Sequence, residues 1–335
     1  MIMLNKKLIA VLTIFLIGSS IIGNCEEIKS HDIIFGGKYV KEAKIKKDRS
    51  IDNKENGKDD SQEKYRLNRY FRPSNNPVLN ATTDKYLEDL IGSDTTNVTI
   101  PDRFLKTPRD TVINYFSLLR EASNPTKDTQ TGCGTIGYSH EPYPIAYKFL
   151  ADSYQKRLPY EQYLKSFKNI LHINLIKANQ LPQDKDNPDT IKYFVELETI
   201  EGTNQPKGVF AYYYGYIYLQ KIDSVYKIVN MEYTPQNFLC GAYHGWSHDA
   251  KYFVEIKYGN WCHLVDGSVT IKQDGYEKRA YFKDKDGNEY YVLFYQLTNG
   301  NDIKIADYKK DKDGNWERIY INPEKCLEKN NNKLR

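Results

Sequence analysis

The sequence predicts an α+β protein, in which helices come first and antiparallel strands follow. Three observations favour this class. Apolar residues recur at helical spacing between residues 107 and 167, and four segments rich in branched and aromatic residues follow them. In the last third of the chain, one hexapeptide containing Asp-Gly occurs twice between segments of strand type. Helices grouped before strands are typical of α+β rather than α/β proteins.

The amino terminus has the three parts of an export signal. Lys6 and Lys7 form a short basic region, Leu8 to Ile17 is an apolar run, and the small residues 18–20 follow. This run is shorter than the roughly 20 apolar residues that a membrane-spanning helix needs. We therefore expect residues 1–24 to be a signal peptide of a bacterial type, and the rest of the chain to act outside the cytoplasm.

The residues around Cys25 resemble a bacterial lipobox, in which a cysteine becomes the lipid-bearing first residue. Asn24 departs from the Gly, Ala or Ser that such motifs prefer before the cysteine. Cleavage by the ordinary signal peptidase near Gly23 stays open for that reason. We expect a lipid on Cys25 to anchor the protein to the outer face of the cell membrane, and secretion is the alternative.

The chain has five cysteines, and lipidation of Cys25 leaves an even four. Cys133, Cys240, Cys262 and Cys326 can pair in three ways. We favour Cys133 with Cys240 and Cys262 with Cys326, since each pair then stays inside one predicted domain. Four reduced, buried thiols are the alternative.

Residues 25–106 are expected to be a disordered to partly ordered tether. Lys, Asp, Glu, Asn and Ser dominate from Glu26 to about Gln62, and such a segment buries too little apolar surface to offset its chain entropy. Beyond it, the apolar residues between Tyr86 and Ile91 predict one short helix, and prolines interrupt the rest.

The first folded domain is placed at residues 107–238, and three helices are expected to open it. The segment Thr107-Pro108-Arg109-Asp110 supplies a cap residue, a proline at the first helical position and an acid in the first turn. Apolar residues recur at helical spacing after it. A second helix is expected from Ala146 through about Arg157, and Pro159 opens the third.

Four strands are expected to follow as one antiparallel sheet, at Leu171–Ala178, Ile191–Ile200, Val209–Leu219 and Val225–Tyr233. On the third of them, Tyr212, Tyr214, Tyr216 and Tyr218 share one face, and Tyr213 lies on the other. On the second strand, Glu196 and Glu198 alternate with Val195 and Leu197. This alternation predicts that the carboxylates point outward and the apolar residues inward.

This order of helices and strands, with the phrases at residues 146–150 and 159–167, resembles the nuclear transport factor 2-like superfamily, also called ketosteroid-isomerase-like. The resemblance covers about residues 107–238. It implies a sheet that wraps around the helices as a cone, with a pocket at its mouth. Enzymes of that superfamily hold Asp, His or Tyr in the cone, so a small-molecule enzyme that uses the cone pocket is an alternative function.

A smaller domain of one helix and antiparallel hairpins is expected at residues 239–335. Ser247-His248-Asp249 precedes apolar residues at helical spacing and caps a short helix that ends at Gly259. The hexapeptide Lys-Asp-Lys-Asp-Gly-Asn stands at 283–288 and again at 310–315. Asp-Gly between strand residues predicts a hairpin at each copy, which makes about four strands.

No metal or cofactor is expected. Cys240, His244 and His248 are four residues apart and could bind zinc with Cys262 or His263, so Cys240, His244, His248 and His263 are weak candidates. An oxidising compartment and the nearby glycines argue against such a site. The loop at 132–137 matches the spacing of a dinucleotide-binding loop, but it follows a helix instead of a strand.

The sequence favours a non-catalytic function and predicts no catalytic residues. It has no Gly-x-Ser-x-Gly elbow, and its net charge of +4 is spread among interspersed acids and bases, which argues against a nucleic-acid partner. We expect an extracytoplasmic binding protein whose partner is an unknown cell-envelope protein or a small ligand. A structural cell-envelope protein is a further alternative.

Overall fold

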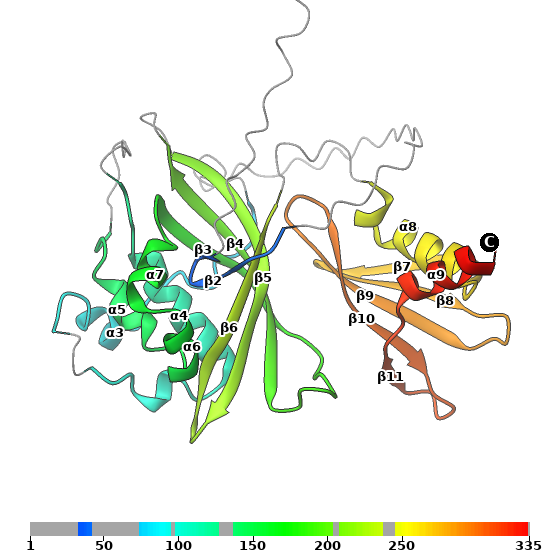
Figure 1. Ribbon diagram of the computed structural model, residues 1–335, viewed down its shortest axis with the longest axis horizontal. Coiled ribbons are helices and arrows are strands. Elements are labelled where there is room, and N and C mark those ends of the chain that lie inside the picture. The colour runs from blue at the N-terminus through cyan, green and yellow to red at the C-terminus, as the bar shows by residue number, and fades with distance from the viewer. Residues whose placement is uncertain are drawn as a thin grey trace, which may run out of the picture. The chain divides into compact units, whose positions relative to one another are not determined.

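A computed structural model describes residues 33–41, 74–94, 98–126, 137–203, 208–236 and 245–333 (Figure 1). Over these residues the protein is mixed α+β, as predicted, with seven α-helices and two sheets. No helix within these ranges is both long enough and apolar enough to cross a membrane. The predicted signal peptide at 1–24, Cys25 and the domain boundary at 238 lie outside the described residues.

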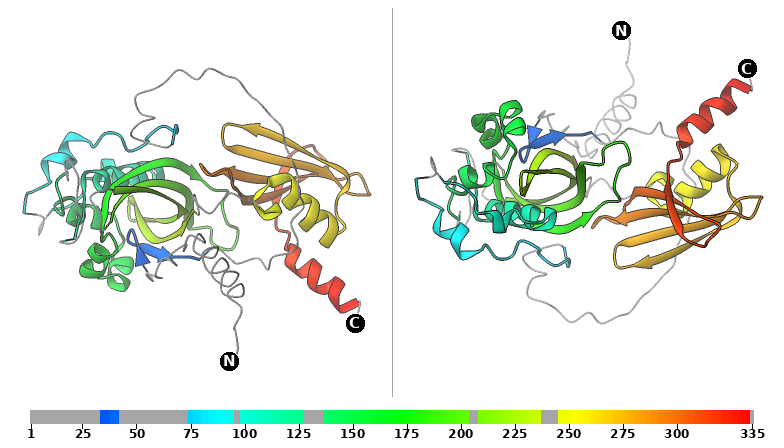
Figure 2. Two further views of the ribbon diagram at one scale, coloured as in Figure 1. Left: turned by 90° about the horizontal axis from the view of Figure 1, so that it is seen from above. Right: turned by 90° about the horizontal axis from the view of Figure 1, so that it is seen from below.

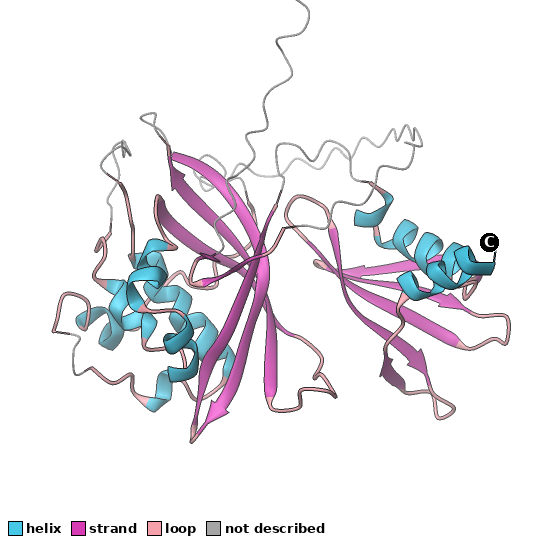
Figure 3. Ribbon diagram, viewed as in Figure 1, coloured by secondary structure: helices cyan, strands magenta, loops and turns pink. Residues whose placement is uncertain are grey.

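The first sheet has the strand order β1-β2-β6-β5-β4-β3, and four of its strands form the predicted meander (Figure 3). These are β3 (Ile170–Gln180), β4 (Thr190–Gly202), β5 (Gly208–Ile222) and β6 (Val225–Pro235), each antiparallel to the next. Seen end on in Figure 2, these strands curl. The sequence predicts all four because each segment is rich in branched and aromatic residues and is bounded by turns.

A hairpin of β1 (Ile33–Ile34) and β2 (Gly37–Tyr39) completes this sheet, so the expectation of a tether is wrong for residues 33–41. Strand β2 runs parallel to β6. Phe35, at the turn, is fully buried, and its ring centroid lies 4.8 Å from that of Tyr213. A Cβ on Gly37 would lie 2.7 Å from Met231 Cβ, so this close pairing requires glycine.

The first predicted helix is confirmed as α4 (Pro108–Glu121), with Thr107 Oγ1 accepting a hydrogen bond from Asp110 N at 3.0 Å. The second is wrong as a single helix, because it divides into α5 (Pro142–Tyr147) and α6 (Asp152–Arg157). Leu150 forms a parallel bridge with Ile228 of β6, and Ala151 N donates to Ile228 O at 2.8 Å. This tertiary pairing interrupts the helical pattern. The third helix is α7 (Tyr160–Lys165).

Residues 74–94 and 98–106 also belong to the folded core, which the tether prediction missed. The expected short helix is α3 (Lys85–Asp89), and a 3-10 turn, η1 (Asp102–Phe104), follows it. Asn80 is fully buried, and its Nδ2 donates to Phe116 O at 2.8 Å and to Ile173 O at 3.1 Å. One amide therefore fastens this segment to both α4 and β3.

Helices α3 to α7 lie against one face of the first sheet, which we call its inner face (Figure 1). Large aromatic side chains fill the space between them. Those less than 2% exposed are Phe35, Tyr115, Phe116, Tyr143, Phe149, Tyr163, Phe167 and Tyr233. Tyr163 OH donates to Tyr115 OH at 3.2 Å, so these two buried hydroxyls satisfy each other.

The second sheet is antiparallel, with the order β11-β10-β9-β8-β7. Its strands are β7 (Asp266–Asp274), β8 (Glu277–Lys283), β9 (Glu289–Gln296), β10 (Asp302–Lys310) and β11 (Trp316–Ile319), which is one more than expected. Both repeated hexapeptides form the predicted hairpins. Asp284 Oδ1 accepts from the amides of Asp286 and Asn288, and Asp311 Oδ1 accepts from those of Asp313 and Asn315.

Helix α8 (Ala250–Val254) begins as predicted, with Asp249 Oδ1 accepting from Tyr252 N at 2.9 Å. It continues as a π-helix, η3 (Glu255–Trp261), so the helical segment passes Gly259, where its end was expected. Helix α9 (Pro323–Lys333) follows β11.

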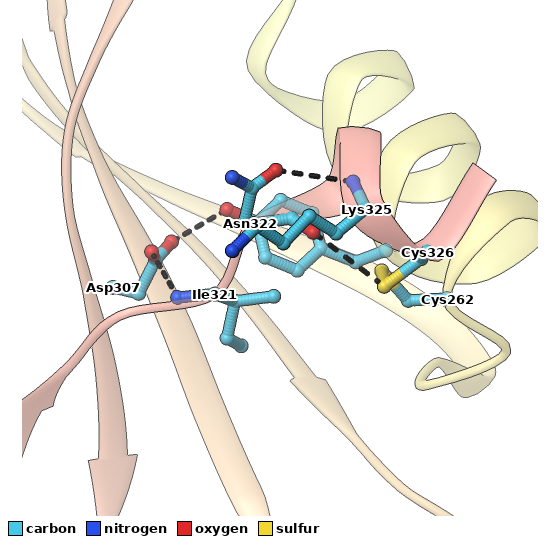
Figure 4. The surroundings of a disulfide bond; sticks show 7 residues. Cys262, Asp307, Ile321, Asn322, Lys325 and Cys326 are labelled. Carbon is cyan, nitrogen blue, oxygen red and sulfur yellow. Dashed lines mark hydrogen bonds between the residues drawn. A yellow bond between two sulfur atoms is a disulfide. The ribbon is translucent and has the colours of Figure 1, made fainter. Parts of the chain in front are cut away.

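The expected disulfide between Cys262 and Cys326 is confirmed, and it links the end of η3 to α9 (Figure 4). Its Cα atoms are 5.0 Å apart. Beside it, Asp307 Oδ2 accepts from Ile321 N at 3.3 Å (Figure 4). Asp307 Oδ1 accepts from Tyr258 OH at 2.6 Å. The carboxylate thus holds both η3 and the segment before α9. Cys133 and Cys240 lie outside the described residues.

The position of Phe35 predicts that the first hairpin contributes directly to stability. Phe35→Ala should lower the free energy of unfolding by about 3–5 kcal/mol, because it opens a cavity among packed rings. Urea unfolding measures the change, and Lys38→Ala, at an exposed position of the same hairpin, is the control. Equal stability of Phe35→Ala and the wild type would show that the hairpin is not part of the core.

Candidate functional site

Two carboxylates lie on the outer face of the first sheet, and the sequence misjudged their surroundings. Glu196 and Glu198 were expected to point into solvent, but both are fully buried. The alternation itself is correct, since Val195 and Leu197 belong to the inner core. The carboxylates point outward as predicted, but the expectation of solvent exposure is wrong because other parts of the chain cover the outer face of β4.

Glu196 forms a buried ion pair with Lys177, its cross-strand neighbour on β3. Lys177 Nζ lies 2.6 Å from Glu196 Oε2, and the two side chains are 2% and 0% exposed. Two further contacts come from the end of β9 and the turn after it, since Lys177 Nζ donates to Gln296 O at 2.6 Å and Thr298 N donates to Glu196 Oε1 at 2.8 Å. Gln236 Nε2, just after β6 of the first sheet, donates to the same oxygen at 2.7 Å. Burial lowers the pKa of Lys177, although the Glu196 carboxylate acts in the opposite direction.

Glu198 is held by donors from three segments. Its oxygens accept from Tyr212 OH at 2.6 Å, from Asn174 Nδ2 at 3.1 Å and from Ser74 N at 3.3 Å. A buried carboxylate needs such donors to offset the loss of hydration. Both glutamates therefore serve the packing of segments against the outer face.

Glu201 is an inward-facing carboxylate that sequence reasoning missed. Val195 and Leu197 lie on the inner face of β4, and Glu201 occupies the same face because every second residue of a strand does. This period of two in the sequence could have predicted its position. Tyr213 OH donates to Glu201 Oε1 at 2.7 Å, and Thr199 Oγ1 donates to the same oxygen at 3.1 Å. Burial raises the pKa of Glu201, and these hydrogen bonds oppose the rise.

The second sheet carries a hollow of about 430 Å³, which we call the β7 hollow. Its volume is within the ~300–1,000 Å³ that is usual for ligand pockets. The residues that line it come from four strands: Asp266, Ser268, Thr270, Lys272, Tyr281, Phe282, Lys283, Glu289, Tyr290 and Trp316. None of them was a candidate from the sequence.

An aromatic row crosses the face of the sheet that carries the hollow. The strand register places Thr270, Tyr281, Tyr291 and Tyr308 side by side across β7 to β10. The ring centroids of Tyr281 and Tyr291 are 5.4 Å apart, and those of Tyr291 and Tyr308 are 4.5 Å apart. Burial raises the pKa of Tyr291 to about 12, so its phenol is neutral at physiological pH.

Trp316, from β11, packs against this row. Its ring centroid lies 4.7 Å from that of Tyr291 and 5.9 Å from that of Tyr281, and both contacts are edge-to-face. The tryptophan is 37% exposed. The hollow therefore has an aromatic floor that solvent can reach.

The charges around the hollow are balanced. Lys283 Nζ lies 3.0 Å and Lys310 Nζ 2.9 Å from Glu289, one at each carboxylate oxygen. Asp266 stands opposite Lys283 across the β7–β8 ladder. Lys272 Nζ lies 5.2 Å from the ring centroid of Tyr281. Lys310 does not line the hollow, so the lining itself carries two carboxylates and two ammonium groups.

Of the four weak metal candidates from the sequence, the structure describes only His248 and His263. Cys240 and His244 lie outside the described residues. His248 ends a 3-10 turn, His263 follows η3, and Cys262 is committed to the disulfide, which removes it as a zinc ligand. Across the ranges that the structure describes, no three His, Cys, Asp or Glu residues form a group that could hold a metal ion. Of the 132–137 loop, only Gly137 is described.

Comparison of the chain with models of known protein families, with curated proteins and with solved structures finds no match.

The ion pair predicts a large effect from removing one charge. Lys177→Met should lower the free energy of unfolding by about 3–5 kcal/mol, since Glu196 stays buried without its cation. Adding Glu196→Gln should restore most of the loss, because the amide oxygen still accepts from Thr298 N. Urea unfolding of both variants measures the coupling.

Lys185→Met is the matched control for this pair. Lys185 and Glu317 lie 3.5 Å apart with side chains that are 79% and 64% exposed, so little change is expected. A Lys177→Met variant as stable as the wild type, or a double variant no better than the single one, would contradict the proposed coupling.

The raised pKa of Glu201 predicts a pH-dependent loss of stability. Between its ordinary value of 4.5 and its higher folded value, the folded chain binds more protons than the unfolded chain, so stability falls as pH rises through this window. Glu201→Gln should remove that loss and be more stable than the wild type at pH 7, but not below about pH 4.5. Urea midpoints at pH 4–8 measure this. The exposed Glu328→Gln is the control, and unchanged pH dependence in Glu201→Gln would refute the prediction.

Proposed function

We propose that the protein is a non-catalytic extracytoplasmic binding protein, held at the outer face of the membrane by a lipid on Cys25, which binds its ligand in the β7 hollow. The observation that carries this proposal is the solvent-accessible aromatic floor of the hollow. Concave sites with aromatic linings and a few polar groups are the usual form of ligand pockets. The signal peptide and the lipid anchor rest on the sequence of residues 1–25.

The chemistry of the hollow supports binding better than catalysis. Ser268 and Thr270 supply hydroxyls, but no histidine stands among the lining residues to activate them. Glu289 is engaged by two lysines, and burial raises the pKa of Tyr290 to about 12. These groups can donate and accept hydrogen bonds, but they are poorly suited to transfer protons near neutral pH.

A small-molecule enzyme is the second candidate, and Glu201 is the observation that favours it. An inward carboxylate with a raised pKa, next to a tyrosine hydroxyl, is suited to general acid–base chemistry. The resemblance to the nuclear transport factor 2-like superfamily, which we retain as a proposal, would place a pocket on this side of the sheet. The aromatic side chains packed on the inner face argue against an open pocket there.

The binding function predicts that Trp316→Ala loses a ligand that the wild type retains. Melting temperatures of the purified chain are measured with a panel of oligosaccharides, short peptides and nucleosides, because a ligand that binds only the folded state raises the melting temperature. At least one class should raise it for the wild type and not for Trp316→Ala. Tyr320→Ala removes an aromatic that is 84% exposed and does not line the hollow, so it should behave as the wild type. No shift with any class, or an equal shift in Trp316→Ala, would refute binding at this site.

A further inference from the structure

We infer that the β7 hollow binds an uncharged oligosaccharide, stacked on Trp316 and Tyr281; this inference rests on the proposed binding function. The aromatic floor supplies the first argument. One face of a pyranose ring consists of C–H groups with partial positive charge, and the face of an aromatic ring carries partial negative charge. Trp316 is 37% exposed, and Tyr281 packs edge-to-face beside it.

The floor is held in place before any ligand arrives. Tyr281 packs against Tyr291, and Tyr291 stacks on Tyr308 with an interplanar angle of 15°. These rings stand on neighbouring strands of one antiparallel sheet. A stacking surface that is already ordered loses little conformational entropy when a ligand binds.

The rim of the hollow suits hydroxyl groups. Asp266, Ser268, Thr270 and Lys272 recur at every second position of β7, and all four are exposed. Carboxylates accept hydrogen bonds, ammonium groups donate them, and the hydroxyls of Ser and Thr do both. Each sugar hydroxyl both donates and accepts, so this mixture meets the needs of a polyhydroxylated ligand.

The charge balance selects an uncharged ligand. The lining contains two carboxylates, Asp266 and Glu289, and two ammonium groups, Lys272 and Lys283. A polyanion would meet the first pair and a basic peptide the second, and like charges brought together cost binding energy. A neutral sugar chain avoids both penalties.

The form of strand β7 argues against a peptide added as a further strand. It is an edge strand of the sheet, which is the position where peptides add. The register with β8 shifts between Asp266 and Thr270, so the strand is irregular along the hollow. Such an irregularity at an edge disfavours pairing with another strand. We therefore expect the ligand to be bound by side chains on the face of the sheet and not by the backbone of its edge strand.

Isothermal titration of the exported chain tests the inference with two uncharged tetrasaccharides, chitotetraose and cellotetraose. Poly-γ-glutamate and a lysine-rich peptide are the charged competitors. We expect at least one tetrasaccharide to bind, with an affinity that 0.5 M NaCl leaves nearly unchanged, since no ion pair is involved. Trp316→Ala should weaken binding about tenfold or more, whereas Trp316→Phe, which keeps an aromatic face, should retain most of it.

The outcomes separate this inference from the proposed function. Binding of a charged competitor but of neither sugar, lost in Trp316→Ala, would overturn the sugar assignment and leave a binding protein. Absence of binding by all four probes would count against the sugar assignment, and the broader panel above then decides the binding function. Sugar binding equal in the wild type and Trp316→Ala would overturn the location. Urea unfolding of each variant confirms that it is folded, and Tyr320→Ala should bind as the wild type does.

Discussion

The buried ion pair between Lys177 and Glu196 is the interaction on which the arrangement of the two sheets depends. Removing two charges from water costs several kcal/mol per ion unless further hydrogen bonds satisfy them. Here Gln236, just after β6, supplies one of those bonds, and Gln296 O and Thr298 N, at the end of β9 and in the turn after it, supply two more. The first sheet therefore relies on groups of the second sheet to satisfy its buried charges, and the contact of the two sheets is specified by polar geometry as well as by apolar area.

The same contact divides one face of the second sheet into two parts. Near the ion pair, Tyr295 and Leu293 pack with Phe194 of the first sheet. Farther along the same strands, the aromatic row continues to Tyr281 and Trp316, where it is open to solvent. The candidate site is thus the uncovered continuation of a structural interface. A binding surface built on such a support holds its side chains in fixed positions.

The sequence predicts features that local chemistry decides. Thr107 marks a helix start, and the two Asp-Gly hexapeptides mark hairpins, because each effect acts within a few residues. Features decided by tertiary contact were missed. Periodicity shows that Glu196 and Val195 lie on opposite faces, but it cannot show that another sheet covers the outer one. The helix break at Leu150 depends on Ile228, which is far along the chain.

The β7 hollow could not be predicted from the sequence, because it too is formed by tertiary contacts. Lys272, Tyr281 and Trp316 each read as an ordinary strand residue, and only the cross-strand register brings them to one place. The inward position of Glu201 could have been predicted from the sequence, since this residue continues the alternation of Val195 and Leu197. The two locations differ in their surroundings. Glu201 is half-buried at the end of β4, and buried rings fill the core of the first sheet beside it. The β7 hollow is already open, and binding there leaves the core of the first sheet unchanged.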